Sequence, residues 1–184
     1  MELSKTAFVI LGMLRMGKRT GYEIKALVDV STRHFWAASY GQIYPELKRL
    51  EEAGLIEGQA AETGERRRRE YELTASGERA LHDWLTAGPP LHVELRHEGV
   101  LRFFFSAPLD PGEQVELLRS IRSEHATVRG ELEAIRPAAE TLEGEGNPPL
   151  SVLEWGIAYQ DFVINWCSET ERRIIEQTAS GQRS

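Results

Sequence analysis

Residues 39–56 read S-Y-G-Q-I-Y-P-E-L-K-R-L-E-E-A-G-L-I, and their spacing predicts one amphipathic helix. Ile43, Leu47 and Leu50 recur at intervals of four and three residues, so they lie on one face of a helix. The polar residues between them lie on the opposite face. We therefore expect one side of this helix to be buried in the domain and the other side to be available for binding.

The two ends of this segment carry helix start and stop signals. Ser39 is a suitable N-cap, and Gln42 three residues later completes the pattern of a capping box. Gly54 suits the position just after a helix, where a left-handed backbone conformation is common. Pro45 leaves two interpretations open: it begins the helix, or it lies inside and removes one backbone hydrogen bond.

Two shorter helices are predicted before this segment. The first spans residues 4–16, begins at Ser4 or Thr6, and has a broad apolar face. The second follows Thr20, which caps it, and ends near residue 31. Its expected buried side consists of Tyr22, Ile24, Leu27 and Val28.

The periodicity of the sequence changes after Gly54. Residues 55–62 and 70–74 have the residue types and the alternation of strands, and residues 63–70 form a polar tip between them. Three helices followed by a two-stranded hairpin is the plan of a winged helix-turn-helix domain. The hairpin is then the wing of that domain.

The rest of the chain is predicted to be helical. One helix follows Thr74 and ends at the Gly/Pro sequence 87–90, where we place a domain boundary. Three more helices are expected at residues 93–105, 111–135 and 150–178, with a loop over residues 136–149. The predicted fold is mostly α with a small β-hairpin wing: a winged helix-turn-helix domain over residues 1–88 and a helical dimerisation domain over residues 89–184.

The net charge of −7 is confined to the second half of the chain. Residues 1–86 contain 13 basic and 13 acidic residues, whereas residues 87–184 contain 9 basic and 16 acidic ones. An acidic half is a poor ligand for phosphate, but it suits self-association or effector binding. The clustered basic charge lies in the predicted winged-helix domain.

Cysteine usage and hydropathy indicate a cytoplasmic protein without membrane contact. Cys167 is the single cysteine, which excludes an intramolecular disulfide and suits a reducing compartment. No run approaches the roughly 18 apolar residues that a membrane-spanning helix needs. The N-terminus lacks the basic region and cleavage site of a signal peptide.

The helix at residues 39–56 and its neighbours resemble the PadR family of transcriptional regulators. The resemblance covers residues 5–86 closely and residues 93–178 more loosely. It implies that Pro45 lies inside the recognition helix. The residues that carry it are Gly21-Tyr22-Glu23-Ile24, Gly41, Ile43-Tyr44-Pro45, Leu47, Leu50-Glu51, Gly54-Leu55-Ile56, Tyr71, Leu73-Thr74 and Gly77.

This resemblance implies a dimeric, sequence-specific DNA-binding regulator, a repressor released from a pseudo-palindromic operator by a small-molecule effector. A helix fits the major groove of double-stranded DNA and reaches base edges with its N-terminal residues and exposed face. The expected contact residues of this helix are Ser39, Tyr40, Gln42, Tyr44, Lys48 and Arg49. The alternative interpretation is an ordinary solvated face.

Four consecutive arginines, Arg66, Arg67, Arg68 and Arg69, lie at the predicted wing. Side chains alternate along a hairpin, so two of the four are expected to point toward DNA and contact phosphate. The alternative is a solvated turn in which the arginines pair with the neighbouring glutamates.

Large aromatic residues are numerous in the second half and leave two interpretations open. They line an effector pocket, or they pack the core and a dimer interface. The pocket candidates are Trp84, Phe104, Trp155, Tyr159, Phe162 and Trp166. The apolar seam Ile121, Val128, Leu132 and Ile135 has the same two interpretations, and we favour dimerisation because DNA readers of this plan use two half-sites.

No pattern in the sequence predicts catalysis, a metal or a cofactor. His92, His97 and His125 lie in no metal-ligand spacing and are interpreted as surface histidines. Cys167 has no evident base partner and is interpreted as a small buried hydrophobe. Two other functions stay open: a winged-helix protein-interaction module without DNA readout, and a small helical hydrolase, against which the absence of a nucleophile–base motif counts.

Overall fold

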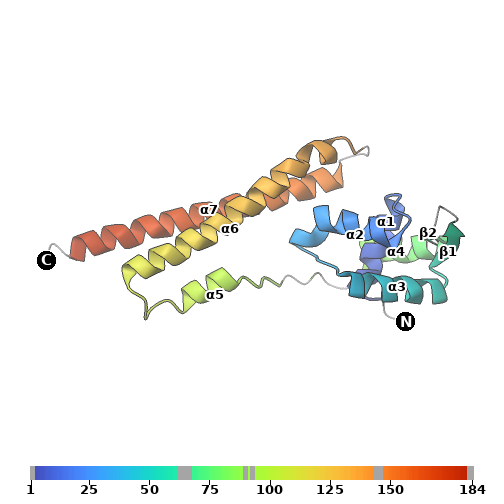
Figure 1. The fold of residues 1–184 in the computed structure, drawn as a ribbon, viewed down its shortest axis with the longest axis horizontal. Coiled ribbons are helices and arrows are strands. Elements are labelled where there is room, and N and C mark those ends of the chain that lie inside the picture. The colour runs from blue at the N-terminus through green and yellow to red at the C-terminus, as the bar shows by residue number, and fades with distance from the viewer. Residues whose placement is uncertain (1–2, 62–67, 89–90, 92–93, 143–146, 182–184) are drawn as a thin grey trace. The chain divides into compact units, whose positions relative to one another are not determined.

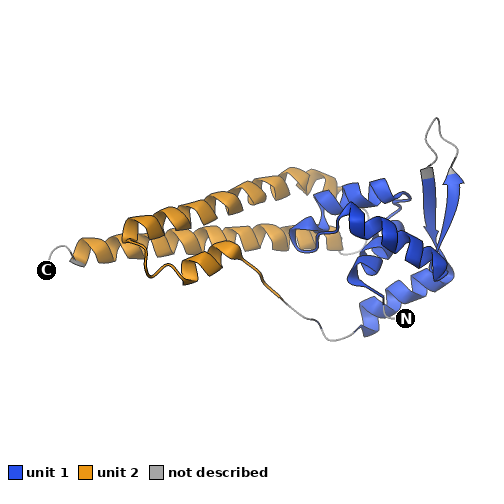
Figure 2. Cartoon of the chain, turned by 60° about the horizontal axis from the view of Figure 1, so that its bottom comes forward, with its two compact units in different colours: residues 1–92 blue, residues 93–184 orange. Residues whose placement is uncertain are grey.

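The chain forms two compact units, residues 1–92 and residues 93–184, in the computed structural model (Figure 2). The residues described are 3–61, 68–88, 91, 94–142 and 147–181. The division lies at residue 92, whereas the sequence places it after residue 88. Within the described residues, no helix is long and apolar enough to cross a membrane.

Unit 1 consists of four helices and a two-stranded hairpin (Figure 1). In order these are α1 (Lys5–Arg15), α2 (Gly21–Val30), the 3-10 turn η1 (Thr32–His34), α3 (Tyr40–Glu52), β1 (Ile56–Ala61), β2 (Arg68–Leu73) and α4 (Ala75–Ala87). The helix–helix–helix–hairpin order is the one that the sequence predicts. The amphipathic helix predicted within residues 39–56 is α3.

The apolar face of α3 lies in the centre of the unit 1 core. Ile43 and Leu47 are completely buried, and Leu50 nearly so, among apolar residues of α1 and α2. One expectation for α2 is wrong: Tyr22 is 67% exposed, while Ile24 and Val28 are fully buried. Tyr22 lies two residues before Ile24 and therefore on the other side of α2, whereas Gly21, Ile24 and Val28 share the buried side.

Local sequence signals set the ends of these helices. Ser4 caps α1 by accepting a hydrogen bond from the Ala7 N–H at 3.0 Å. Thr20 and Glu23 form a reciprocal capping box on α2, and the bond from the Thr20 hydroxyl is the main reason why the pKa of Glu23 is lowered. These caps satisfy backbone donors that have no partner within the helix.

The ends of α3 also agree with the sequence. Pro45 lies inside the helix. Gly54 adopts a φ of +67°, a left-handed conformation that a residue with a side chain enters at a cost. The Leu55 N–H then reaches back to the Leu50 carbonyl at 3.0 Å, which closes the helix end and directs the chain into β1.

The hairpin pairs β1 with β2 in antiparallel register, with Ile56 opposite Leu73 and Ala61 opposite Arg68. Arg68 and Arg69 are therefore strand residues, and their expected place in the polar tip is wrong. The ladder reaches them because Arg69 pairs with Ala60, and Arg68 with Ala61, across the hairpin. The tip itself, residues 62–67, lies outside the described residues.

Unit 2 contains α5 (Glu98–Phe104), α6 (Pro111–Glu140) and α7 (Pro148–Gly181), and α6 and α7 lie side by side (Figure 1). Helix α5 begins five residues later than the predicted start at residue 93, because the His97 ring caps it. Asp110 caps α6 with Pro111 in its first turn, as predicted. The expected loop from residue 136 is partly helix, since α6 continues to Glu140.

The long α6 seam packs inside the chain, which corrects its interpretation as a dimer interface. Leu118 and Ile121 pack with Val163 and Cys167 of α7. Farther along, Leu132, with Val128 and Ile135 beside it, packs with Leu153 and Ile157. Continued packing of Ile135 and Ala139 against α7 explains why α6 runs through Pro137. Cys167 is completely buried, as interpreted, and burial raises the pKa of its thiol.

The intramolecular seam predicts a large stability cost for truncating Leu118. Removing a fully buried leucine leaves a cavity, so Leu118→Ala should lower the free energy of unfolding by about 2–5 kcal/mol. Leu101→Ala is the matched control, because Leu101 on α5 is 57% exposed. Urea unfolding followed by circular dichroism measures both, and equal losses for the two variants would contradict the packing described.

Candidate nucleic-acid interface

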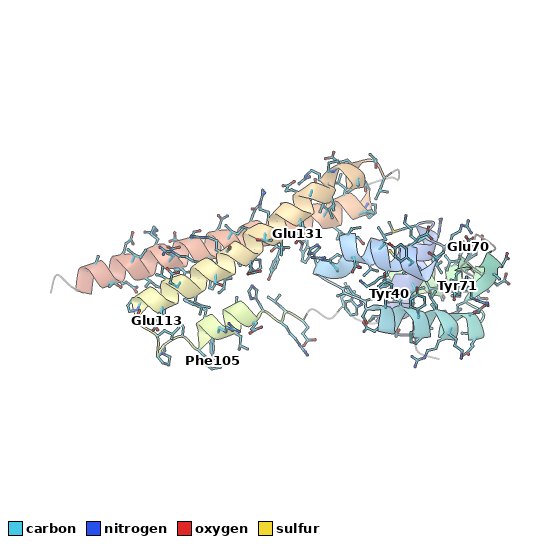
Figure 3. The ribbon with its side chains drawn as sticks, in the orientation of Figure 1. Tyr40, Glu70, Tyr71, Phe105, Glu113 and Glu131 are labelled. Atoms are coloured by element: carbon cyan, nitrogen blue, oxygen red, sulfur yellow. The ribbon has the colours of Figure 1, made fainter. Side chains whose placement is uncertain are left out.

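The solvent-facing side of α3 is polar and aromatic. Tyr40 and Tyr44 are about half exposed, and the side chains of Lys48 and Arg49 are 78% and 71% exposed. All four belong to one 13-residue helix with Tyr40 as its first residue (Figure 3), and the two tyrosines flank its buried face while the two cations lie farther round. A helix of this kind, seated firmly on its apolar side, presents the geometry that a major groove accepts.

The two tyrosines are held in place by α2. Their rings stack with centroids 6.0 Å apart, and the Lys25 ammonium lies 5.2 Å from the Tyr40 centroid. A Cβ on Gly21 would come within 2.8 Å of the Tyr44 ring, so only glycine permits this close approach. The phenol groups thus project from a supported position and can donate to phosphate or sugar oxygens.

The Gln42 side chain folds back on the start of α3. Its Oε1 accepts hydrogen bonds from the Ser39 N–H at 2.9 Å and from the Ser39 hydroxyl at 3.1 Å. A bidentate pair with adenine needs both the Oε1 and the amide NH₂ of glutamine. In this conformation the NH₂ group is the part that reaches outward, so full adenine readout requires Gln42 to exchange its bonds with Ser39.

The two cations of α3 pair with neighbouring carboxylates. Lys48 lies 3.7 Å from Glu52, and Arg49 lies 3.3 Å from Glu46. The Lys48–Glu52 pair is exposed on both sides, and pairs of this type contribute about 0–1 kcal/mol, so a phosphate can replace Glu52 at little cost. Glu46 itself is buried and accepts a hydrogen bond from the Ser4 hydroxyl at 2.9 Å, which ties α3 to the start of α1.

The side chain of Arg69, from the outer part of the hairpin, pairs with α3. Its guanidinium binds the Glu51 carboxylate, which also accepts a hydrogen bond from the Gly58 N–H at 3.2 Å. A Cβ on Gly58 would lie 2.5 Å from Arg69 Nε and 2.7 Å from Glu51 Oε1. The bond to Glu51 is the main reason why the pKa of Arg69 is raised. Glycine at position 58 thus makes room for a link between hairpin and helix.

The structure describes less of the other three wing arginines. Arg66 and Arg67 lie outside the described residues, and for Arg68 only its place in β2 is described. A second link holds the hairpin on its far side: the Tyr71 N–H donates to the Arg19 carbonyl at 2.7 Å, and the Arg19 guanidinium pairs with Glu72. Figure 3 labels Tyr71 on the hairpin and Tyr40 on α3.

The aromatic residues proposed as an effector pocket are divided between the two units. Trp84 belongs to unit 1, where it stacks on Phe8 at 4.6 Å. Trp166 packs edge-on against Phe103 of α5, and Trp155 stacks with Tyr159 along α7. Three members are largely exposed: Phe104, Trp155 and Phe162. Packing accounts for Trp84 and Trp166, whereas the exposed α7 residues are accessible to another molecule.

Two histidines that the sequence suggested were ordinary surface residues are joined to each other. The Nε2 atoms of His97 and His125 lie 2.8 Å apart, and His125 Nδ1 lies 2.5 Å from Gln160 Oε1. They were missed because they come from different helices, so no spacing in the sequence connects them; His92 lies outside the described residues. The described residues contain no group of three or more His, Cys, Asp or Glu side chains that could hold a metal.

Two family models match the two units. The model "Transcriptional regulator PadR-like family" matches residues 10–83, and the model "Virulence activator alpha C-term" matches residues 95–174. The negative transcriptional regulator PadR of Bacillus subtilis is 32% identical over 140 residues, which cover 73% of this chain and 77% of that protein. The chain belongs to the PadR family. It is therefore a transcriptional regulator, as the sequence predicted.

Solved structures of PadR proteins share the fold. B. subtilis PadR in complex with operator DNA superposes with a TM-score of 0.81 at 27% identity, covering 91% of this chain and 98% of that one. The same regulator in complex with p-coumaric acid has a TM-score of 0.75 at 26% identity over 91% and 96%. A PadR-like regulator of Bacillus cereus, at 21% identity, has a TM-score of 0.79 over 94% and 99%. The predicted winged-helix fold with its helical second domain is confirmed.

The observed bonding of Gln42 to Ser39 in this PadR protein can be separated by substitution from its expected contact with DNA. Gln42→Glu keeps an acceptor for Ser39 and places a negative charge at a helix start, so we expect the free energy of unfolding to change by less than about 1 kcal/mol. The carboxylate cannot donate and repels phosphate, so affinity for a fragment of the protein's own promoter should fall about tenfold or more.

Gln42→Ala is the companion variant, because it loses both the cap and the amide. Fluorescence anisotropy measures DNA affinity and urea unfolding measures stability. A Gln42→Glu variant that binds the promoter as tightly as the parent protein would place Gln42 outside the DNA interface.

Proposed function

We propose that this PadR protein is a dimeric repressor that binds a pseudo-palindromic operator through α3 and leaves it when a small-molecule effector binds. The observation that carries the proposal is the exposed face of α3, where aromatic, amide and basic groups project from a helix whose opposite side is fully buried. B. subtilis PadR, which covers 91% of this chain in superposition, binds operator DNA with the same fold.

Each group on this surface has a chemical task in the proposed complex. Gln42, with Lys48 beside it, reads base edges, and Tyr40 and Tyr44 contact the sugar–phosphate backbone. Arg49 neutralises phosphate, as do Arg66, Arg67 and Arg68 of the wing. Ser39 keeps the start of α3 in position through Gln42. Arg69 is assigned a different task, because its guanidinium already binds Glu51: it fixes the wing relative to α3.

The second copy of the chain is proposed to cover the outer face of α7. Val152, Trp155 and Phe162 are exposed there at spacings of three and seven residues, the pattern of a helix–helix seam. The opposite face of α7 is occupied by α6. Two copies joined through these residues supply two recognition helices for two half-sites.

An effector that binds unit 2 would act through the separation or angle of the two recognition helices. Coupling of this kind requires only that the effector binds one arrangement of the dimer more tightly than the other. B. subtilis PadR binds p-coumaric acid, a small aromatic acid, which supports a small molecule of related size as the effector class for this protein.

Binding to a fragment of the protein's own promoter, measured at several salt concentrations, tests the proposal. We expect a complex of two chains per fragment whose affinity falls steeply with salt. Replacing Arg66, Arg67 and Arg68 together by alanine should reduce the log–log salt slope by about 0.9 for each phosphate that is no longer neutralised, summed over both copies. The control is Arg172→Ala on α7, where Arg172 pairs with Glu169 and Glu176.

Absence of a salt-dependent complex would instead favour a winged-helix module that binds another protein. A triple variant with an unchanged slope would remove the wing from the phosphate contacts while leaving α3 as the reader.

The assignment of Arg69 is tested by a double-mutant cycle with Glu51. If Arg69 positions the wing, Arg69→Ala and Glu51→Ala should weaken DNA binding by similar factors, and the double variant should be no weaker than either. The salt slope should stay unchanged in all three. If Arg69 instead contacted phosphate, Arg69→Ala would lower the slope by about 0.9 per phosphate, and Glu51→Ala would leave affinity unchanged or improve it.

A further inference from the structure

A continuous chain of hydrogen bonds crosses the three helices of unit 2. The Val100 N–H of α5 donates to His97 Nδ1 at 3.2 Å. His97 Nε2 lies 2.8 Å from His125 Nε2 of α6, and His125 Nδ1 lies 2.5 Å from Oε1 of Gln160 on α7. Gln160 is buried, and both imidazoles are half-buried. This chain of hydrogen bonds includes none of the α3 and wing residues that are proposed to contact DNA. The proposed function gives its residues no role.

The direction of every proton in this chain is determined by its first donor. A backbone N–H can only donate, so His97 Nδ1 must accept and the His97 proton must lie on Nε2. His125 Nε2 then accepts, and the His125 proton lies on Nδ1, where it meets an amide oxygen. Rotating the Gln160 amide would require a His97 ring without any proton, so one arrangement alone fits, with both imidazoles neutral.

We propose that the His97–His125–Gln160 chain is a proton-sensitive clasp, which holds α5 on α6 and α7 while both imidazoles are neutral and releases α5 when either takes up a proton. A proton added to His125 places two N–H groups opposite each other across the 2.8 Å contact. A proton added to His97 Nδ1 faces the Val100 N–H and removes the cap of α5.

Helix α5 depends on this contact because it is short. It has seven residues, and helices of that length are not stable alone in water. Two further contacts are near the clasp: Gly99 lies so close to α6 that a Cβ would be 2.7 Å from Ile121 Cγ1, and Phe103 packs on Trp166 of α7. Release of the clasp therefore separates Phe103 from Trp166.

The neighbours of the clasp within the described residues favour neutral imidazoles. Tyr159 places its ring 6.1 Å from that of His125. Charged residues of the three helices form ion pairs with one another. Arg102 pairs with Glu98 within α5, and two pairs join α6 to α7: Arg122–Glu171 and Arg129–Asp161. The carboxylates of these pairs are thus neutralised by guanidinium groups.

The pH range of the clasp follows from His97. Burial, with His125 as the second cause, lowers the pKa of His97 below the ordinary value of 6.5. The unfolded chain then binds a proton more readily than the folded one. The clasp stabilises the folded protein fully above pH 6.5. This contribution is lost as the pH falls through the lowered pKa of His97.

Two variants retain polar contacts while removing the titration. His97→Asn keeps a side-chain acceptor for the Val100 N–H, and His125→Gln keeps an acceptor toward α5 and a donor toward Gln160. In the parent protein the folding equilibrium constant should fall by up to about tenfold for each pH unit below the ordinary pKa of His97, and the double variant should lose this dependence. His82→Gln is the control, because His82 is an exposed histidine of unit 1.

Fluorine NMR of protein labelled with 5-fluorotryptophan reports the position of α5 directly, with the Trp166 signal assigned by Trp166→Phe. In the parent protein this signal should move on acidification from about pH 7.5 to about pH 5.5, across the histidine range, and it should not move in the double variant. An equal shift in both proteins, or a pH dependence removed by His82→Gln, would overturn the proposal.

Nitrogen-15 NMR of the parent protein tests the protonation of both imidazoles even if the double variant does not fold. At neutral pH the proposal requires a proton on Nε2 of His97 and on Nδ1 of His125. Any other pair of tautomers, or a charged ring at that pH, rules out the clasp. DNA binding enters none of these measurements, so their outcome is separate from that of the proposed function.

Discussion

The burial of Ile43, Leu47 and Leu50 is the constraint on which the rest of unit 1 depends. Each of these side chains contributes about 1.5–3 kcal/mol by leaving water, so together they fix the rotation of α3 about its own axis. Once that rotation is fixed, the residues opposite have no choice of direction. Tyr40 and Tyr44 then lie beside the buried face, where each ring contacts a residue of α2 and remains about half exposed.

The wing is positioned by polar contacts with the same helix. Glu51 stands one residue beyond Leu50, at the edge of the buried face, and its carboxylate joins the Gly58 N–H to the Arg69 guanidinium. The position of the hairpin is therefore set by its contacts with α3. In the proposed complex a carboxylate on α3 would be unfavourable near DNA phosphates, and the charge of Glu51 is compensated within the protein by Arg69.

Features that depend on neighbouring residues could be predicted from the sequence. The caps at Ser4, Thr20 and Asp110, the turn at Gly54 and the buried face of α3 all follow from spacings within one turn of helix. The α3 residues of the candidate site follow from the same periodicity. The expected burial of Tyr22 was wrong because a residue two positions from Ile24 lies on the other side of a helix with 3.6 residues per turn, although its side chain is large and apolar.

Contacts between distant segments could not be predicted in this way. The seam of α6 has the pattern that any partner helix would satisfy, so the sequence alone did not distinguish α7 of the same chain from a second copy. The bond between Arg69 and Glu51 joins residues 18 apart, and that between His97 and His125 joins residues 28 apart. Each of these two bonds forms only when the tertiary fold brings its two residues together.

The buried polar side chains show what apolar packing leaves undetermined. A leucine seam tolerates a shift along the helix axis, because one apolar side chain can replace another with little loss. Glu46 with Ser4, Gln160 with His125, and Glu171 with its two arginines each join two helices by directed bonds. A shift would leave these groups buried without partners, at a cost of about 1–3 kcal/mol for each neutral group and more for a charge. Hydrophobic burial thus brings the helices together, and these few polar links select the register in which they stay.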